Sequence, residues 1–275
     1  MYTHEKINER IYIIREGYAP NNGLTIGLVI GDKKAAIIDS GMGVIATLRS
    51  YIEKITDKPI ICIVTHGHPD HVGGAALFDE VYMNNKDAWI LDWALPLEKR
   101  LSDMDEFSSN NKLLRIEAEK NPVICENLTY KNMEDGDVFD LGGITLKMYK
   151  LPGHTPGSLA AYCDEEKIAF ASDAIISNIV LSDENRNGIQ TCENALRRFM
   201  DSIDVNTVIY SGHSQQPLPR ELAYDLLAAY EEILSNKTGD DMITHFKFAE
   251  EIHPGIRLKK HVHGSATVTY NVDLV

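Results

Sequence analysis

The chain has 275 residues, of which 44% are hydrophobic, and this is enough for a large buried core within one domain. Its 27 Lys and Arg residues against 41 Asp and Glu residues give a formal net charge of −14 at pH 7, which disfavours binding to the phosphate backbone of nucleic acids. No apolar run approaches the roughly 20 residues that a membrane-spanning helix needs, so we expect neither nucleic-acid nor membrane partners.

The N-terminal residues and the cysteines both predict a cytoplasmic protein. The first six residues are polar and contain no signal-peptide core. The cysteines are few and widely spaced, without a CxxC pair, and we expect them to be reduced and mostly buried: Cys62, Cys125, Cys163 and Cys192.

The first third of the chain predicts strands, a helix and a further strand. Short apolar runs bounded by turn signals are typical of buried strands, and apolar positions three and four residues apart are typical of a helix. The expected strands cover residues 11–14, 24–30, 35–38 and 60–64, and the expected helix runs from about 44 to 55. The third of these strands leads into Asp39-Ser40-Gly41.

Residues 84–135 interrupt this pattern and predict a helical insert. They contain mixed charges, both tryptophans and helical stretches such as Lys112 to Lys120. The insert could be a lid or substrate wall, or a helical elaboration packed away from the site. The same two readings apply to its apolar residues, which would form a lid face or ordinary core: Trp89, Trp93, Met104 and Phe107.

The second strand-rich half begins with a predicted hairpin over residues 138–150. Further strands are expected at 159–163, 168–171, 205–210 and 266–273, with helices over about 191–202 and 221–234. We expect residues 1–275 to form one domain, with the insert at about 84–135 and a C-terminal extension at about 240–275. Substrate choice is expected to depend on these two segments.

The stretch from Thr65 to Gly74 is the most informative in the chain. It places three imidazoles and a carboxylate within six residues, directly after the predicted 60–64 strand. His66 and His68, two residues apart on an extended loop, project to the same side. Asp70 and His71 then turn away from that pair, so one metal ion cannot easily use all four side chains. This spacing predicts two neighbouring metal ions.

Three further candidate ligands each follow a predicted strand. They are His154, Asp173 and His213, and loops at one end of a sheet are where functional side chains gather on a rigid scaffold. Asn178 and Tyr162 are additional candidates, as hydrogen-bond donors to an oxyanion.

Together these residues resemble the metallo-β-lactamase superfamily, whose signature is HxHxDH followed by a separate His, an Asp and a last His. Here the signature corresponds to His66-Gly67-His68-Pro69-Asp70-His71, then His154, Asp173 and His213. The stretch 37–41 resembles the first motif of the superfamily, and the resemblance spans roughly residues 11 to 215. It lies closest to the glyoxalase-II-like and lactamase-like branch.

The resemblance implies an α/β (α+β) fold, a four-layer αβ/βα sandwich of two mixed sheets with helices outside. It also implies a site at one edge, at the strand ends. The ligand sets that it implies are His66, His68 and His154 for one metal and Asp70, His71 and His213 for the other, with Asp173 bridging. Asp39 would have a structural role, accepting hydrogen bonds beneath the metal loop.

The function that the resemblance implies is hydrolysis of a small acyl substrate, which could be an ester, thioester, lactone or lactam. Two Zn²⁺ ions per chain are expected because the ligands are His and Asp, although iron or manganese could also occupy such a site. A metal-bound hydroxide would attack the substrate, and Asp70 would be the catalytic residue that orients it and passes on its proton. The site would carry a net charge of +1 and favour anionic small molecules.

Two rival functions stay open at this point. One is a metal-dependent phosphodiesterase or nuclease of the same superfamily, which the net charge of the chain disfavours. The other is a non-catalytic binding protein that retains the fold, although no ligand is missing.

A second HxH pair, His261 and His263, is either a lead-in to the last strand or a tail that lines the substrate pocket. The sequence does not decide whether the chain forms a homo-oligomer.

Overall fold

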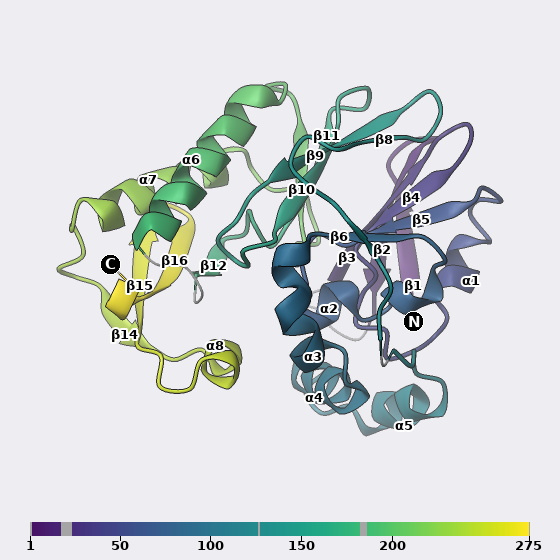
Figure 1. Cartoon of the computed structure of the whole chain (residues 1–275), viewed down its shortest axis with the longest axis horizontal. Helices are drawn as coiled ribbons and strands as arrows, with labels where there is room; N and C mark the ends of the chain where they lie inside the picture. The colour runs from purple at the N-terminus through teal and green to yellow at the C-terminus, as the bar shows by residue number, and fades with distance from the viewer. Residues whose placement is uncertain (1, 18–23, 126, 182–185, 275) are drawn as a thin grey trace.

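A computed structural model describes residues 2–17, 24–125, 127–181 and 186–274. Within these ranges the strands form three sheets, and helices lie on the outer faces of the first two (Figure 1). No helix in the described part of the chain is long and apolar enough to cross a membrane. The four cysteines lie buried and form no disulfide among the described residues.

The first sheet contains seven strands that lie side by side in sequence order. Neighbours from β1 to β4 pair antiparallel, and those from β4 to β7 pair parallel. The strands are β1 (Tyr2–Lys6), β2 (Ile11–Glu16), β3 (Leu24–Ile30), β4 (Ala35–Ile38), β5 (Ile60–Ile63), β6 (Val81–Met83) and β7 (Lys131–Asn132). Both β4 and β5 end at the edge where the site residues begin.

The second sheet has the strand order β13-β11-β10-β9-β8, and the third has the order β12-β16-β15-β14. The second is built from β8 (Val138–Asp140), β9 (Thr145–Lys150), β10 (Leu159–Cys163), β11 (Ile168–Ser172) and β13 (Val208–Ser211). The third is built from β12 (Asn178–Leu181), β14 (Met242–Thr244), β15 (Leu258–His263) and β16 (Ala266–Asn271). The sequence did not predict this third sheet.

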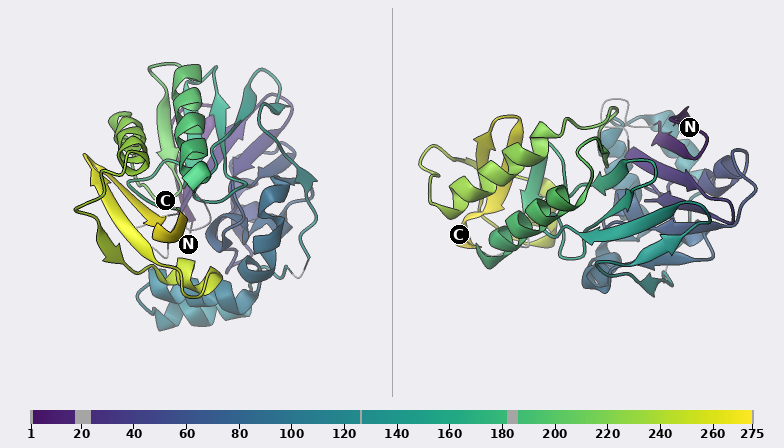
Figure 2. Two further views of the ribbon diagram at one scale, coloured as in Figure 1. Left: turned by 60° about the vertical axis from the view of Figure 1, so that its left-hand side comes forward. Right: turned by 90° about the horizontal axis from the view of Figure 1, so that it is seen from above.

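The core confirms the expected four-layer arrangement. Because side chains alternate across a strand, Ile13 of β2 packs toward the second sheet while Ile14 packs under the helices on the opposite face. One apolar cluster fills the space between the first two sheets. Another joins the first sheet to α1 (Leu48–Ile52), and a third joins the second sheet to α6 (Arg186–Ser202) and α7 (Glu221–Leu234). The two outer helical layers are visible in Figure 2.

The helix predicted over 44–55 is shorter in the structure, where α1 covers only Leu48–Ile52. Val44 and Ile45 lie outside the helix and pack with Leu101 and Met104 of α4 and with Leu24 of β3. Their neighbour Gly43 has a positive φ of 63°, which a helix does not contain.

The segment 84–135 is helical for most of its length, although residue 126 lies outside the described residues. It contains η2 (Asn85–Ile90), α3 (Leu91–Ala94), α4 (Leu97–Phe107) and α5 (Lys112–Lys120), and it ends in β7. Met104 is fully buried in core, Trp89 is 49% exposed, and Phe107 and Trp93 lie beside the site. The four apolar residues therefore do not form a single lid face or a single core.

The segment after residue 240 contributes β14, α8 (Lys247–Ile252), β15, β16 and η3 (Val272–Leu274). His261 lies between two carboxylates, with Nδ1 2.7 Å from Asp241 and Nε2 3.0 Å from Glu232. His263 also contacts Glu232, at 3.0 Å. This second HxH pair therefore joins β15 to α7 and does not line the cavity beside the site. It is α8 that approaches the site from the C-terminal segment (Figure 1).

Candidate metal centre

The HxHxDH motif spans the loop that follows a strand and the first turn of a helix. His66 and His68 follow β5 on an extended loop, and α2 (Pro69–Val72) begins directly afterwards. His68 is the N-cap residue, with φ −72° and ψ 153°, and proline at the first helical position has a backbone suited to helix initiation. The helical turn places Asp70 and His71 beyond the extended pair, but the expectation that both turn away from it is wrong for His71, whose ring packs against His66 with 4.1 Å between ring centroids.

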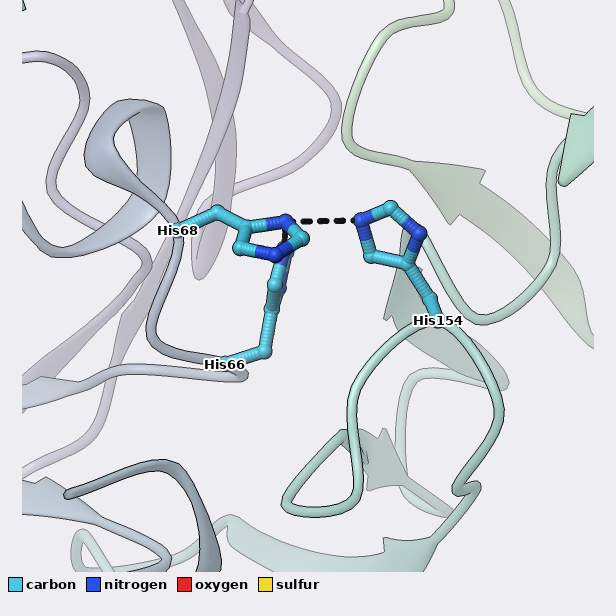
Figure 3. Close-up of side chains that lie close together, drawn as sticks. All are labelled: His66, His68 and His154. Atoms are coloured by element: carbon cyan, nitrogen blue, oxygen red, sulfur yellow. Dashed lines mark hydrogen bonds between the residues drawn. The ribbon is translucent and has the colours of Figure 1, made fainter. Parts of the chain in front are cut away.

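Three imidazole nitrogens converge at the first candidate cluster (Figure 3). Nδ1 of His68 lies 3.2 Å from Nε2 of His66 and 2.8 Å from Nε2 of His154. His154 comes from the loop between β9 and β10, on the second sheet. The structure therefore brings together side chains that are separated by 86 residues in sequence, with their nitrogens positioned to share one cation.

A second candidate cluster contains Asp70, His71 and His213. Oδ2 of Asp70 lies 3.4 Å from Nε2 of His71 and 3.2 Å from Nε2 of His213. Asp173, which follows β11, lies between the clusters: its Oδ2 is 3.1 Å from Nε2 of His213 and 3.5 Å from Nε2 of His154. All seven residues expected from the sequence thus meet at one edge of the two sheets.

Several buried atoms at this edge have no hydrogen-bond partner among the described residues. They include Nε2 of His68, Nε2 of His71 and Oδ1 of Asp173. Buried polar atoms are normally paired, and a cation held between the clusters would satisfy the nitrogen of His71 and the oxygen of Asp173. Imidazole and carboxylate groups are also ligands that zinc accepts. The residues present therefore fit a zinc centre.

Asp39 accepts hydrogen bonds beneath the motif loop, in the role that the resemblance implies for it. The backbone amide of Thr65 and Nδ1 of His71 each lie 2.8 Å from its carboxylate, and the hydroxyl of Ser172 lies 2.9 Å away. The bond from Nδ1 leaves Nε2 of His71 as the nitrogen that faces the cluster. Thr65 also contacts Nδ1 of His66, at 3.1 Å, which orients that ring in the same way.

Asp87 is a buried carboxylate that the sequence did not single out. It accepts hydrogen bonds from the backbone amide of Gly67 at 2.9 Å, from the amide of Gly157 at 2.7 Å and from the hydroxyl of Thr155 at 2.7 Å. It thereby joins the loop that carries His66 to the loop that carries His154. A Cβ at position 157 would collide with the Asp87 carboxylate, which explains the glycine.

The two clusters differ in the protonation states of their histidines. Burial lowers the pKa of His66 and of His68, so both rings are neutral at pH 7, as metal ligands must be. Burial would raise the pKa of Asp70, but the neighbouring His71 and His213 hold it well below its ordinary value. Although burial opposes the change, Asp173 and Asp70 raise the pKa of His213 to about 10. Without a metal, the second cluster therefore binds protons that the first does not.

A cavity of about 790 Å³ opens beside the candidate centre, with His154, Asp173 and His213 in its wall. Apart from Glu106, its remaining lining is apolar or uncharged and includes Phe107, Ile176, Leu218, Phe246, Ser177, Asn178, Gln215 and Gln216. Asn178 thus reaches the cavity as expected. Tyr162 does not, because it is buried in the core and its hydroxyl donates to Asp164 at 2.6 Å; the expectation that it could serve the site is wrong.

The sequence profile of the metallo-β-lactamase superfamily matches residues 24–237. Two curated relatives have names that describe hydrolases. "Acyl-coenzyme A thioesterase MBLAC2" of Homo sapiens is 26% identical over 229 residues, which cover 77% of this chain and 81% of that protein. "Hydroxyacylglutathione hydrolase GloC" of Haemophilus influenzae is 28% identical over 192 residues, which cover 66% of this chain and 81% of that protein.

A solved structure shares the fold of this chain. The metallo-β-lactamase from Pontibacter korlensis matches with a TM-score of 0.57 at 18% identity, covering 84% of this chain and 99% of that one. The superfamily profile covers most of the chain, and the residues of its signature meet at one site. The chain therefore belongs to the metallo-β-lactamase superfamily and is a hydrolase of that superfamily.

Proposed function

We propose that this protein is a dinuclear zinc-dependent hydrolase of a small acyl substrate. The observation that carries the proposal is the convergence of two side-chain clusters, with Asp173 between them, beside a cavity whose wall contains one residue of each cluster, His154 and His213. His66, His68 and His154 would hold one zinc ion, and Asp70, His71 and His213 would hold the other. The bound ions would polarise a carbonyl oxygen and lower the pKa of water toward neutrality.

The chain's own residues supply the rest of the proposed reaction. Asp70 would orient the attacking water and accept its proton, and its carboxylate is ionised at neutral pH because His71 and His213 hold its pKa well below the ordinary value despite burial. Asn178, at the start of β12, lines the cavity and can donate a hydrogen bond to the substrate. Asp39 and Asp87 keep the two candidate ligand loops in place.

Among acyl compounds, a thioester is the substrate that we favour. One relative described above is named an acyl-coenzyme A thioesterase and the other a hydroxyacylglutathione hydrolase, and an acyl group on the sulfur of coenzyme A or of glutathione is a thioester. The cavity also suits an uncharged group with amides, because it presents Ser177, Asn178 and Gln216 beside an apolar wall. Apart from the candidate ligands, Glu106 is the one charged side chain among the described lining residues, and it pairs with Lys247 at 2.8 Å. Any preference for anionic substrates would thus come from the metal ions alone.

A cytoplasmic location is part of the same proposal. The four buried cysteines form no disulfide among the described residues, which is typical of proteins from a reducing compartment. The insert at 84–135 and the extension at 240–275 are proposed as parts of one domain that shape the cavity.

The test is a substrate panel assayed with zinc-loaded protein. It contains thioesters, lactones, β-lactams and simple phosphodiesters, with His68→Ala as the inactive control. Hydrolysis of at least one acyl compound that is lost in His68→Ala is the expected result. Cleavage of a phosphodiester with no activity on any acyl compound would contradict the proposal and favour the phosphodiesterase alternative.

A further inference from the structure

The short helix α8, from the C-terminal segment, covers one side of the candidate metal centre. The ring of its Phe248 packs edge-to-face on the imidazole of His68, with 4.3 Å between ring centroids and 77° between the planes. The same ring lies 5.0 Å from Trp93 and stacks at 6.4 Å against His154. Phe248 therefore contacts two of the three imidazoles of the first cluster, as well as an aromatic residue of the 84–135 segment.

Two ion pairs attach α8 to α4. Nζ of Lys99 lies 2.6 Å from Glu251, and Nζ of Lys247 lies 2.8 Å from Glu106. Lys99 also lies over the ring of Trp93, 4.3 Å from its centroid. The aromatic contacts and the charged contacts thus hold α8 in one place, against the same part of the 84–135 segment (Figure 2).

Helix α8 buries few apolar side chains in comparison with these aromatic and charged contacts. Its one buried residue, Ala249, belongs to a satellite cluster with Val180 and Leu258, apart from the main cores. A six-residue helix with so few buried apolar contacts can open locally at little cost. Ion pairs at a surface are screened by salt, so the closed position of α8 depends on ionic strength.

The cover borders the cavity, because Phe246, the N-cap residue of α8, lies in the cavity wall. His154, Asp173 and His213 line the cavity, whereas His66 and His68 do not. Phe248 occupies the side of His68 that faces α8, and His68 is only 4% exposed. Substrate therefore has access from the His213 side, beside the loops that follow β11 and β13.

We propose that Phe248 is a positioning residue for His68, and that α8 is a cover that closes the His68 side of the centre. This inference rests on the proposed metal centre but not on the nature of the hydrolysed bond. Phe248 restricts the orientation of the His68 imidazole and excludes water from it, and the pairs Lys99–Glu251 and Lys247–Glu106 keep Phe248 in contact. The cover thereby slows the loss of metal from the first cluster.

The test measures the rate at which zinc-loaded protein transfers zinc to a chromophoric chelator. Phe248→Ala is expected to accelerate transfer about tenfold, as removal of groups that orient metal ligands commonly does, and Phe248→Leu is expected to restore much of the retention. Glu251→Gln is expected to accelerate transfer as well. Glu250→Gln is the matched control, because Glu250 lies on the same helix but pairs with the exposed His245 instead of α4.

Two further readouts separate positioning from general destabilisation. Raising the salt concentration from about 50 to about 500 mM should accelerate zinc transfer in the wild type but much less in Glu251→Gln, in which one of the screened pairs is already broken. The visible absorption of the cobalt-loaded protein should change in Phe248→Ala and stay unchanged in Glu250→Gln. If the wild type retains zinc, and Phe248→Ala shows the same zinc-transfer rate and the same cobalt spectrum as the wild type, the role of Phe248 is wrong. That result would leave the proposed metal centre standing. A wild type that takes up no zinc would overturn the metal centre itself.

Discussion

The carboxylate of Asp39 lies 2.8 Å from Nδ1 of His71, at the end of β4 and directly beneath the motif loop. Both side chains are almost fully buried. The contact connects a residue of the first predicted motif to one of the candidate ligands, and it determines which nitrogen of His71 faces the second cluster. It is the clearest case in this protein of a residue that acts on the site through another residue.

Asp39→Asn should weaken zinc binding at the second cluster by about tenfold to a hundredfold, because the ring of His71 loses the acceptor that orients it and increases its basicity. The measurement is a competition titration with a chelator of known affinity. Asp32→Asn is the control, because Asp32 is an exposed carboxylate in a nearby turn that pairs with Arg10. Unchanged zinc affinity in Asp39→Asn would show that the contact has no role in metal binding.

Asp87→Asn should destabilise the fold by about 2 kcal/mol, because a buried carboxylate that accepts from Gly67, Gly157 and Thr155 is replaced by an amide with one acceptor oxygen. Urea unfolding of the zinc-free protein measures this loss without the contribution of bound metal. Asp92→Asn, an exposed position in α3, is the matched control. If both variants unfold at the same urea concentration as the wild type, Asp87 does not join the two loops in solution.

The two clusters should lose zinc independently when one ligand from each is removed. We expect His154→Ala and His213→Ala to retain roughly one zinc ion per chain in place of two, because each removes a ligand from a different cluster. Elemental analysis after gel filtration provides the count. His245→Ala should retain the wild-type content, because this histidine is exposed and pairs with Glu250. Loss of all zinc in both ligand variants would instead indicate one shared site.

Zinc affinity at the second cluster should rise with pH, whereas that of the first should not above pH 7. In the metal-free protein the pKa of His213 is raised to about 10, so zinc must displace a proton there, and each unit of increasing pH favours binding about tenfold per displaced proton. His66 and His68 are already neutral because burial lowers the pKa of each. Competition titrations at several pH values should resolve two zinc-binding phases, of which one changes its affinity with pH above pH 7 and the other does not. If the affinities of both phases rise equally with pH, the assigned protonation states are wrong.

The candidate ligands could be found from the sequence because each one follows a strand. The apolar runs before His66 and before His213 indicate strands ending at one sheet edge, and the ordered signature supplies the grouping. Asp87 could not be found in this way. It lies 20 residues from Gly67 and 70 from Gly157 along the chain, in a segment without a periodic pattern. Its position depends on where η2 packs, which local sequence does not determine.

The C-terminal segment shows the same limit. The alternation at Ala266, Val268 and Tyr270 predicts β16, but nothing nearby indicates that β12, some 90 residues earlier, would be its parallel partner. The position of Phe248 over His68 likewise follows from α8 docking on α4 through side-chain pairs distant in sequence. The sequence therefore predicted the reactive centre better than the elements that cover it.

The most direct test of the proposed function is the rate of thioester hydrolysis measured against the zinc content of the same samples. Protein stripped of metal, then reloaded stepwise with zinc, is assayed alongside His68→Ala at each step. We predict that activity is absent without zinc, rises as zinc is restored to two ions per chain, and stays absent in His68→Ala. Full hydrolysis by the metal-free protein, or by His68→Ala, would contradict the assignment of this centre as the catalytic site.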